Sequence, residues 1–154
     1  MTTDEVRTVD TGARTVSRQV VVNAPADQLF AMLADPRRHG EVDGSGTVRN
    51  TVSGPDRLSQ DAKFSVNMKM FGFPYRVTSK VTAFEDGRLI EWRHPLGHRW
   101  RWRFEELEAG RTEVTETFDY RGAVFPAGLE LVKAPPANAK SIRDTLTALR
   151  DRFV

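Results

Sequence analysis

The segment 98–107 places the strongest constraint on how this chain folds, because apolar and charged side chains alternate along it. One set of alternate residues is mainly aromatic and the other is charged: His98, Trp100, Trp102 and Phe104 against Arg99, Arg101, Arg103 and Glu105. A strand directs alternate residues to opposite faces, whereas a helix would scatter both sets around its circumference. The segment is therefore predicted to be a strand with one apolar face and one charged face.

The same period-two pattern, bounded by turn residues, predicts six further strands. In chain order the predicted strands span residues 14–22, 46–52, 62–70, 75–84, 88–94, 98–107 and 112–120. Short glycine-bearing turns, such as residues 85–87 and 108–110, join neighbouring strands. Strands linked by such short turns are typical of an antiparallel meander.

Helical spacing of apolar residues indicates helices at both ends of this meander. Residues 26–34 form the first predicted helix, which Asp35-Pro36 ends. Residues 125–133 form a helical piece that Pro135-Pro136 is expected to break or kink. Residues 137–153 then carry one apolar stripe, formed by Ile142, Leu146, Leu149 and Phe153. The sheet must curve around this last helix to bury both apolar surfaces, and a curved sheet around one helix leaves room for an apolar cavity.

Composition limits the remaining possibilities. The 154 residues suit one domain, with 39% hydrophobic and 29% charged residues. Residues 1–13 are polar and lack the apolar core of a secretory signal, so they are expected to form a disordered tail, with a single domain at 14–154 in the cytoplasm. The net charge of +2 does not favour nucleic-acid binding, and no apolar run is long enough to indicate integral membrane contact. The chain has no Cys.

Several segments, in this order and spacing, carry a family resemblance. They are Val21-Val22-Asn23-Ala24-Pro25-Ala26, Leu33-Ala34-Asp35-Pro36, Asp43-Gly44-Ser45-Gly46, and the segments 75–78, 81–84, 90–93 and 110–119. With the long terminal helix, they resemble the START-like SRPBCC superfamily, in its polyketide cyclase/dehydrase and lipid-transport branch. The resemblance covers residues 16–153.

The resemblance implies an α+β helix-grip fold. Its parts are a curved seven-stranded antiparallel sheet, two short helices after the first strand, and a long C-terminal helix that closes a cavity. Members range from passive lipid or hormone carriers to aromatase/cyclases, so the fold alone does not decide the function. No fixed catalytic motif of the family transfers to this sequence.

The inward-facing aromatic and methionine side chains are the candidate ligand-binding residues. Together with Glu116 and the residues of an apolar hairpin turn, the set is Met68, Met70, Phe71, Tyr75, Trp92, Trp100, Trp102, Phe104, Glu116, Phe118 and Tyr120. The alternative is a filled core. Buried indole N–H and phenol O–H groups need partners, and Met adapts to irregular ligands, so the set as a whole favours a cavity.

Glu116, His94 and His98 are the candidate catalytic residues. Glu116 is in phase with Val114 and Phe118, so it is expected to point inward as a ligand anchor or an acid/base. The alternatives are a structural pair with a buried Arg or a Trp N–H, or a position at a wet cavity mouth. His94 and His98 flank a Pro-Leu-Gly turn and are expected either at a cavity rim or half-exposed beside the hairpin. His39 is expected near the entrance. Its spacing from the other two does not match a metal site, so no metal and no cofactor is predicted.

Two surface features have both a structural and a functional interpretation. Arg99, Arg101 and Arg103 form a basic stripe, which indicates either an anionic contact surface or a solvated face with partners such as Glu91 or Glu113. The turn 71–74 contains two Phe and indicates a lid or contact patch, or rings folded over the cavity mouth.

Three functions follow from these features. The preferred one is binding or transport of a hydrophobic small molecule by a monomer or homodimer. The second is an aromatase/cyclase in which Glu116 and a His move protons. The third is a regulatory or toxin-like interaction protein that uses the basic stripe or the Phe-rich turn.

Overall fold

The computed structural model describes residues 5–42, 48–70 and 72–154, which form one eight-stranded antiparallel sheet and a set of helices. The strands are β1 (Arg7–Val9), β2 (Thr15–Val22), β3 (Val48–Ser53), β4 (Lys63–Met70), β5 (Phe73–Glu85), β6 (Leu89–Arg93), β7 (Arg99–Glu108) and β8 (Arg111–Asp119). The helices are α1 (Ala26–Ala34), the 3-10 helix η1 (Pro36–Arg38), α2 (His39–Val42), α3 (Pro126–Leu131) and α4 (Ala134–Arg152). The strand order across the sheet is β1-β2-β8-β7-β6-β5-β4-β3.

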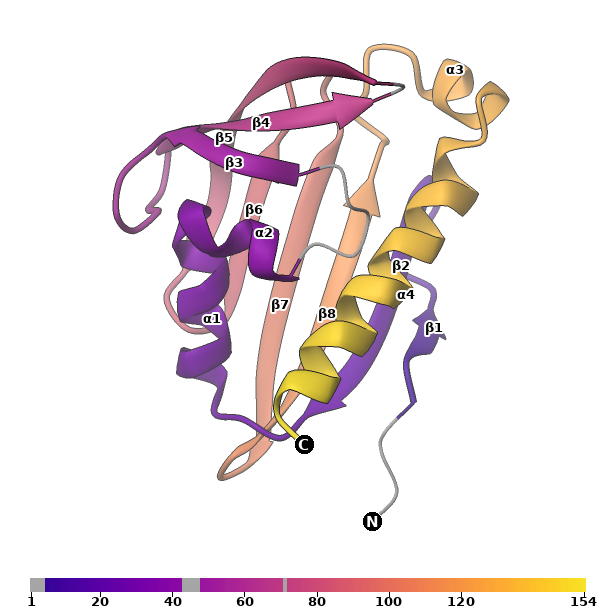
Figure 1. Cartoon of the computed structure of the whole chain (residues 1–154). Helices are drawn as coiled ribbons and strands as arrows, with labels where there is room; N and C mark the ends of the chain where they lie inside the picture. Colours follow the sequence, from indigo (N-terminus) through magenta and orange to yellow (C-terminus); the bar gives the residue numbers. More distant parts are fainter. Residues whose placement is uncertain (1–4, 43–47, 71) are drawn as a thin grey trace.

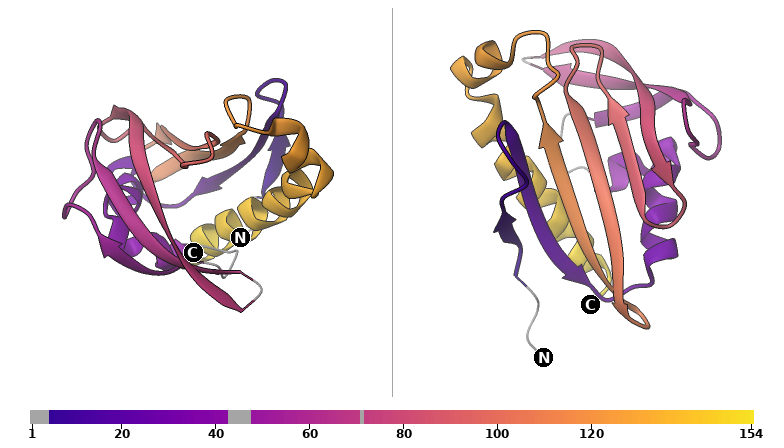
Figure 2. Two further views of the ribbon diagram at one scale, coloured as in Figure 1. Left: turned by 90° about the horizontal axis from the view of Figure 1, so that it is seen from above. Right: turned by 180° about the vertical axis from the view of Figure 1, so that it is seen from behind.

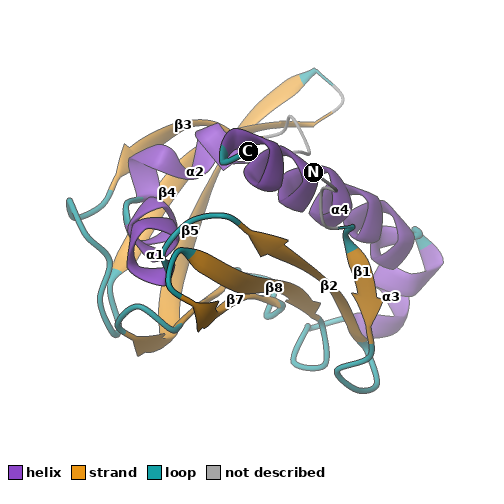
Figure 3. Ribbon diagram, turned by 90° about the horizontal axis from the view of Figure 1, so that it is seen from below, coloured by secondary structure: helices purple, strands orange, loops and turns teal. Residues whose placement is uncertain are grey.

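The sheet is curved, and the helices lie on its inner side (Figures 1 and 2). Helix α4 crosses this side over β2 and β8, while α1 contacts β6 and β7 further along the sheet. Seen from below, the helices and the sheet enclose the interior between them (Figure 3). The predicted helix-grip fold, with its seven-stranded curved antiparallel sheet, is confirmed in strands β2 to β8.

Alternation along the strands produces the core of this fold. Val20 of β2, Val114 of β8 and Phe104 of β7 are buried on the inner face. Helix α4 buries its apolar stripe at Ile142, Leu146 and Leu149 against them. Burying a side chain of this kind contributes about 1.5–3 kcal/mol, so the stripe holds the helix in the curve of the sheet.

The start of α4 differs from the sequence prediction. The helix begins at Ala134, directly after Lys133 in a left-handed conformation, and includes Pro135 and Pro136 in its first turn. The first backbone N–H groups of a helix have no partner within the helix, so proline is tolerated there. The two prolines therefore lie at the start of α4, rather than preceding a helix that begins at residue 137.

Strand β1 lies within the segment 1–13 that the sequence predicts to be a disordered tail. Residues 7–9 pair antiparallel with residues 17–19 of β2, and the Arg7 guanidinium donates to Gln19 Oε1 at 2.7 Å. Without β1, the backbone of β2 would form an unpaired sheet edge. The pairing adds an eighth strand to the seven predicted.

The outer face of the sheet carries a network of arginines and buried carboxylates. Arg101 donates to Glu91 Oε2 at 2.7 Å and to Asp119 Oδ2 at 3.0 Å. Arg99 donates to Glu91 at 3.2 Å, and Arg121 to Asp119 at 2.6 Å. The basic stripe therefore has cross-strand carboxylate partners, as one of its two interpretations predicted, and much of its charge is neutralised within the sheet.

Asp119 depends strongly on this network. Burial alone raises the pKa of its carboxyl group, but hydrogen bonds and charge from Arg121 and Arg101 outweigh burial and bring the pKa down to about 2. The ionised form is thus the one that the folded protein stabilises, and that stabilisation is present above the ordinary value of 3.8 and is lost as pH falls through about 2.

Arg101→Met is predicted to lower the free energy of unfolding by about 3 kcal/mol at neutral pH, because it leaves two buried carboxylates short of a partner. Arg103→Met is the matched control on the same strand face, since Arg103 is exposed and has no ion pair among the described residues. Its cost should stay within about 0.5 kcal/mol. Urea unfolding measures both, and equal losses would contradict a stabilising role for the network.

Candidate ligand-binding site

Burial changes along the inner faces of β6 and β7. Ile90 and Trp102 pair across these two strands and are buried. The next inward pair, Trp92 and Trp100, is only partly buried. Phe104 lies on the other side of Trp102 and packs on Phe30 of α1, with ring centres 5.7 Å apart. The interior is therefore tightly closed beneath α1 and looser toward the turn that joins β6 to β7.

That turn, residues 94–98, meets the loop 120–125 between β8 and α3. The Val124 N–H donates to the Leu96 carbonyl at 2.8 Å. Gly97 has a φ of +97°, and a Cβ added there would collide with the Gly122 carbonyl oxygen, so only glycine fits. Two segments far apart in the sequence are thereby held together at the looser end of the interior.

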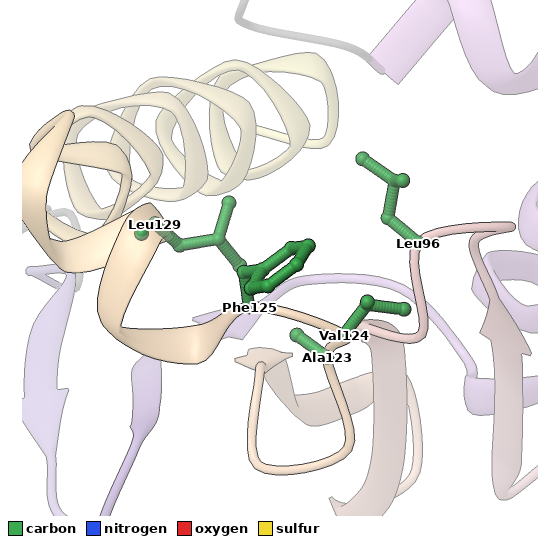
Figure 4. A pocket seen from close by; sticks show the side chains of 6 residues that line it. Leu96, Ala123, Val124, Phe125 and Leu129 are labelled. Carbon is green, nitrogen blue, oxygen red and sulfur yellow. The ribbon is translucent and has the colours of Figure 1, made fainter.

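An apolar pocket of about 120 Å³ lies between these segments and α3. Its lining consists of Leu96, Ala123, Val124, Phe125, Gly128 and Leu129. Leu96 projects from the turn on one side, whereas Phe125 and Leu129 lie on the side of α3 (Figure 4). These residues are absent from the sequence prediction, because they lie in a turn, a loop and a short helix where no periodic pattern marks them.

His94 and His98 stack beside this pocket, with ring centres 4.2 Å apart. His94 Nδ1 accepts a hydrogen bond from the Leu96 N–H at 3.1 Å, whereas His98 Nδ1 is buried with no hydrogen-bond partner. Burial, helped by the neighbouring His94, lowers the pKa of His98 to about 4, and burial also lowers the pKa of His94. Both imidazoles are therefore mainly neutral at pH 7.

Glu116 lies on the inner face, as its phase predicts, and is buried with 7% exposure. In the register of the sheet, Glu116 lies opposite Arg18 of β2 on one side and opposite Trp102 of β7 on the other. Arg18 Nε is buried with no hydrogen-bond partner, and burial together with the charge of Arg143 lowers the pKa of Arg18. Sequence reasoning missed Arg18, although its alternation with Val16 and Val20 places it on the inner face.

Tyr120 connects the sheet to α3. Its hydroxyl donates to Glu130 Oε2 at 2.9 Å, and Arg14 lies 3.4 Å from Glu130 Oε1. The phenol group of this candidate ligand-binding residue therefore already has a carboxylate partner. The contact instead fixes the position of the helix that borders the pocket.

Comparison with known proteins identifies the family to which this chain belongs. The family model described as polyketide cyclase/dehydrase and lipid transport matches residues 13–154. The chain belongs to this family. The uncharacterized protein Rv0088 of Mycobacterium tuberculosis is 53% identical over 152 residues, which cover 96% of this chain and 68% of that protein.

Solved structures share the fold at low identity. A solution structure of a protein from Arthrobacter aurescens has a TM-score of 0.72 at 18% identity and covers 97% of this chain and 93% of its own. The di-domain ARO/CYC protein BexL, from the BE-7585A biosynthetic pathway, has a TM-score of 0.66 at 22% identity and covers 90% of this chain and 45% of its own. Family and fold together suggest that this protein has a hydrophobic ligand-binding role.

The remaining predicted site residues have varied surroundings within this family fold. Phe118 is buried, and its ring centre lies 5.0 Å from that of Trp100. Met68 is partly buried against the core, and Tyr75 is 37% exposed. Phe71 and the Met70 side chain lie outside the described part of the chain.

His39, which was expected near the entrance, is buried. Its ring stacks on Trp92 with centres 4.8 Å apart, and its Nε2 lies 2.7 Å from the Leu33 carbonyl oxygen. Among residues 5–42, 48–70 and 72–154, no group of three or more His, Cys, Asp or Glu side chains is arranged to hold a metal ion. None of the helices in these ranges has the length and apolar character needed to cross a membrane.

The low pKa of His98 predicts a pH-dependent loss of stability. Between about pH 6.5 and pH 4 the unfolded chain binds a proton at this residue and the folded chain does not. The free energy of unfolding therefore decreases as pH falls through that range. His98→Phe keeps a ring against Phe118 but removes this proton uptake. The wild type should therefore lose about 1–2 kcal/mol more than the variant between neutral pH and about pH 4.5. Guanidinium unfolding at both pH values measures the difference. Equal losses of stability in the wild type and the variant would contradict a lowered pKa at His98.

Proposed function

We propose that this protein binds and carries an apolar small molecule with an acyl chain or a ring system, which lies on the inner face of β6 and β7. The observation that carries the proposal is the decrease in burial from Trp102 to Trp100 toward the apolar pocket. The ligand would enter between the turn 94–98 and α3, and would extend from the pocket along the indole rings of Trp92 and Trp100.

Apolar burial would supply most of the affinity. The pocket of about 120 Å³ holds only part of a lipid-sized molecule, so the interior must accommodate the rest. Burying about 300 Å² of ligand surface contributes about 7 kcal/mol before the entropy cost of association. A burial free energy of this size, partly offset by the entropy cost of association, suits a carrier that both takes up and releases its ligand.

Polar anchors are available on the same face. His98 Nδ1 is buried without a hydrogen-bond partner, and a neutral imidazole can serve a ligand hydroxyl or carbonyl group. Arg18 and Glu116 lie deeper, side by side across β2 and β8. An apolar wall with a few polar groups is typical of small-molecule sites.

Acid catalysis at neutral pH is less well supported. A His98 side chain with a pKa of about 4 is only about one-thousandth protonated at pH 7, so it makes a poor general acid. The BexL domains described as ARO/CYC share the fold, but fold alone does not transfer their chemistry. The regulatory alternative loses support because Arg99 and Arg101 are already paired with Glu91.

The proposal predicts that carboxylates at the pocket block uptake of an apolar probe. Wild-type protein should bind N-phenyl-1-naphthylamine, and Leu96→Glu and Phe125→Glu should each weaken binding about tenfold or more, because each places a charge in the apolar lining. A fluorescence titration measures the dissociation constants.

Leu107→Glu is the matched control for these variants. Leu107 is exposed and lies near the β7–β8 turn, at the opposite end of β7 from the pocket, so its substitution should leave probe affinity unchanged. Equal weakening by all three substitutions, or no saturable binding by the wild type, would contradict the proposed site.

A further inference from the structure

The segments that border the pocket carry several apolar side chains with high exposure. They come from the turn 94–98, the loop 120–125 and the region of α3, and we call them the α3 rim: Leu96, Val124, Phe125, Leu131 and Val132, which are 56%, 61%, 76%, 83% and 73% exposed. Hydrophobic side chains that cluster at this level of exposure mark a contact surface more often than a surface that faces water alone.

Helix α3 contacts the core through Leu129, which is partly buried against it. None of its residues is fully buried, and its Glu130 forms polar contacts with Tyr120 and Arg14, whereas Leu131 and the adjoining Val132 are highly exposed. Leu131 and Val132 therefore do not serve to pack α3 against the sheet. Helix α3 lies at one end of the molecule, beside the start of α4 (Figures 1 and 2), so these exposed side chains are available to an external apolar phase.

The segments at this end carry cations that are not neutralised within the fold. In the ranges 72–78, 93–99 and 120–133 the cationic residues are Arg76, Arg93, Arg99, Arg121 and Lys133, and the acidic residue is Glu130. Arg99 and Arg121 are paired with the buried carboxylates of Glu91 and Asp119, so they add little free charge. Glu130 lies against Arg14, so its charge is largely compensated. Arg76, Arg93 and Lys133 form no ion pair within the described residues. Cations around an apolar patch complement the headgroups and acyl region of an anionic bilayer.

We propose that the α3 rim docks on the surface of an anionic lipid bilayer, so that the pocket opens directly into the membrane interface. The pocket is lined by three rim residues, Leu96, Val124 and Phe125, so docking would align its mouth with the acyl region. An apolar ligand then passes between bilayer and protein without crossing water. This transfer step rests on the proposed function, whereas docking itself does not. A second copy of the chain on the rim would instead close the pocket mouth.

Sedimentation with vesicles tests the proposal. Wild-type protein should co-sediment with phosphatidylcholine vesicles that contain phosphatidylglycerol, more weakly with phosphatidylcholine alone, and more weakly again in high salt. The double variant Leu131→Glu with Val132→Glu should bind the anionic vesicles at least tenfold more weakly. Neither residue lines the pocket, so this variant should keep its affinity for N-phenyl-1-naphthylamine.

Leu107→Glu with Val154→Glu is the matched control. It makes the same charge change at two other exposed apolar residues away from the rim, and should leave vesicle binding within twofold of the wild type. Equal loss in both double variants would overturn the proposal, as would absence of vesicle binding by the wild type. A dimer in light scattering that only the rim variant disrupts, without vesicle binding, would overturn it in favour of a contact between copies. Rim-dependent vesicle binding without probe uptake would uphold docking and contradict only the proposed function.

Discussion

Helix α4 packs into the curve of the sheet, and this packing determines which strands other elements must cover. A helix is about 10 Å across with its side chains, and strands lie about 4.8 Å apart, so one helix covers about two strands. Helix α4 accordingly covers β2 and β8 with Ile142, Leu146 and Leu149. The inner faces of β7, β6 and β5 must find other cover, and α1 provides it at one end through Phe30, which packs on Phe104 and Phe84.

The candidate site follows from this geometry. Toward the turn 94–98, beyond the reach of α1, the Trp100 and Trp92 side chains are less buried, and the nearby pocket is bordered by a loop and a short helix. The two faces of the sheet have different roles. Ion pairs around Arg101 on the outer face hold β6, β7 and β8 together, while the inner face supplies the apolar wall. The arginines are therefore engaged in the sheet, and the surface that remains available for binding lies at its end.

Sequence patterns predicted most of the fold because its elements have clear periods. The alternation of Trp and Arg in β7 specified both faces of that strand, and the bounds of α1 were predicted as Ala26–Ala34. Glu116 was placed inward by the same logic. The three residues of β1 were missed because so short a strand shows no periodic pattern. The start of α4 was misplaced because the sequence alone does not distinguish a proline in the first turn of a helix from a proline that breaks one. The pocket was missed because Leu96 and Phe125 come together only through contacts between a turn and a loop, which a linear pattern does not record.

Indole N–H signals test whether an apolar ligand lies at the looser end of the inner face. All three Trp residues of the chain lie on this face, with Trp92 and Trp100 toward the pocket and Trp102 toward α1. In protein labelled with ¹⁵N at Trp and titrated with dodecanoic acid, we expect the Trp92 and Trp100 signals to shift with saturation while the Trp102 signal stays nearly constant. A saturable shift at Trp102 alone, or binding that leaves all three signals unchanged, would contradict it.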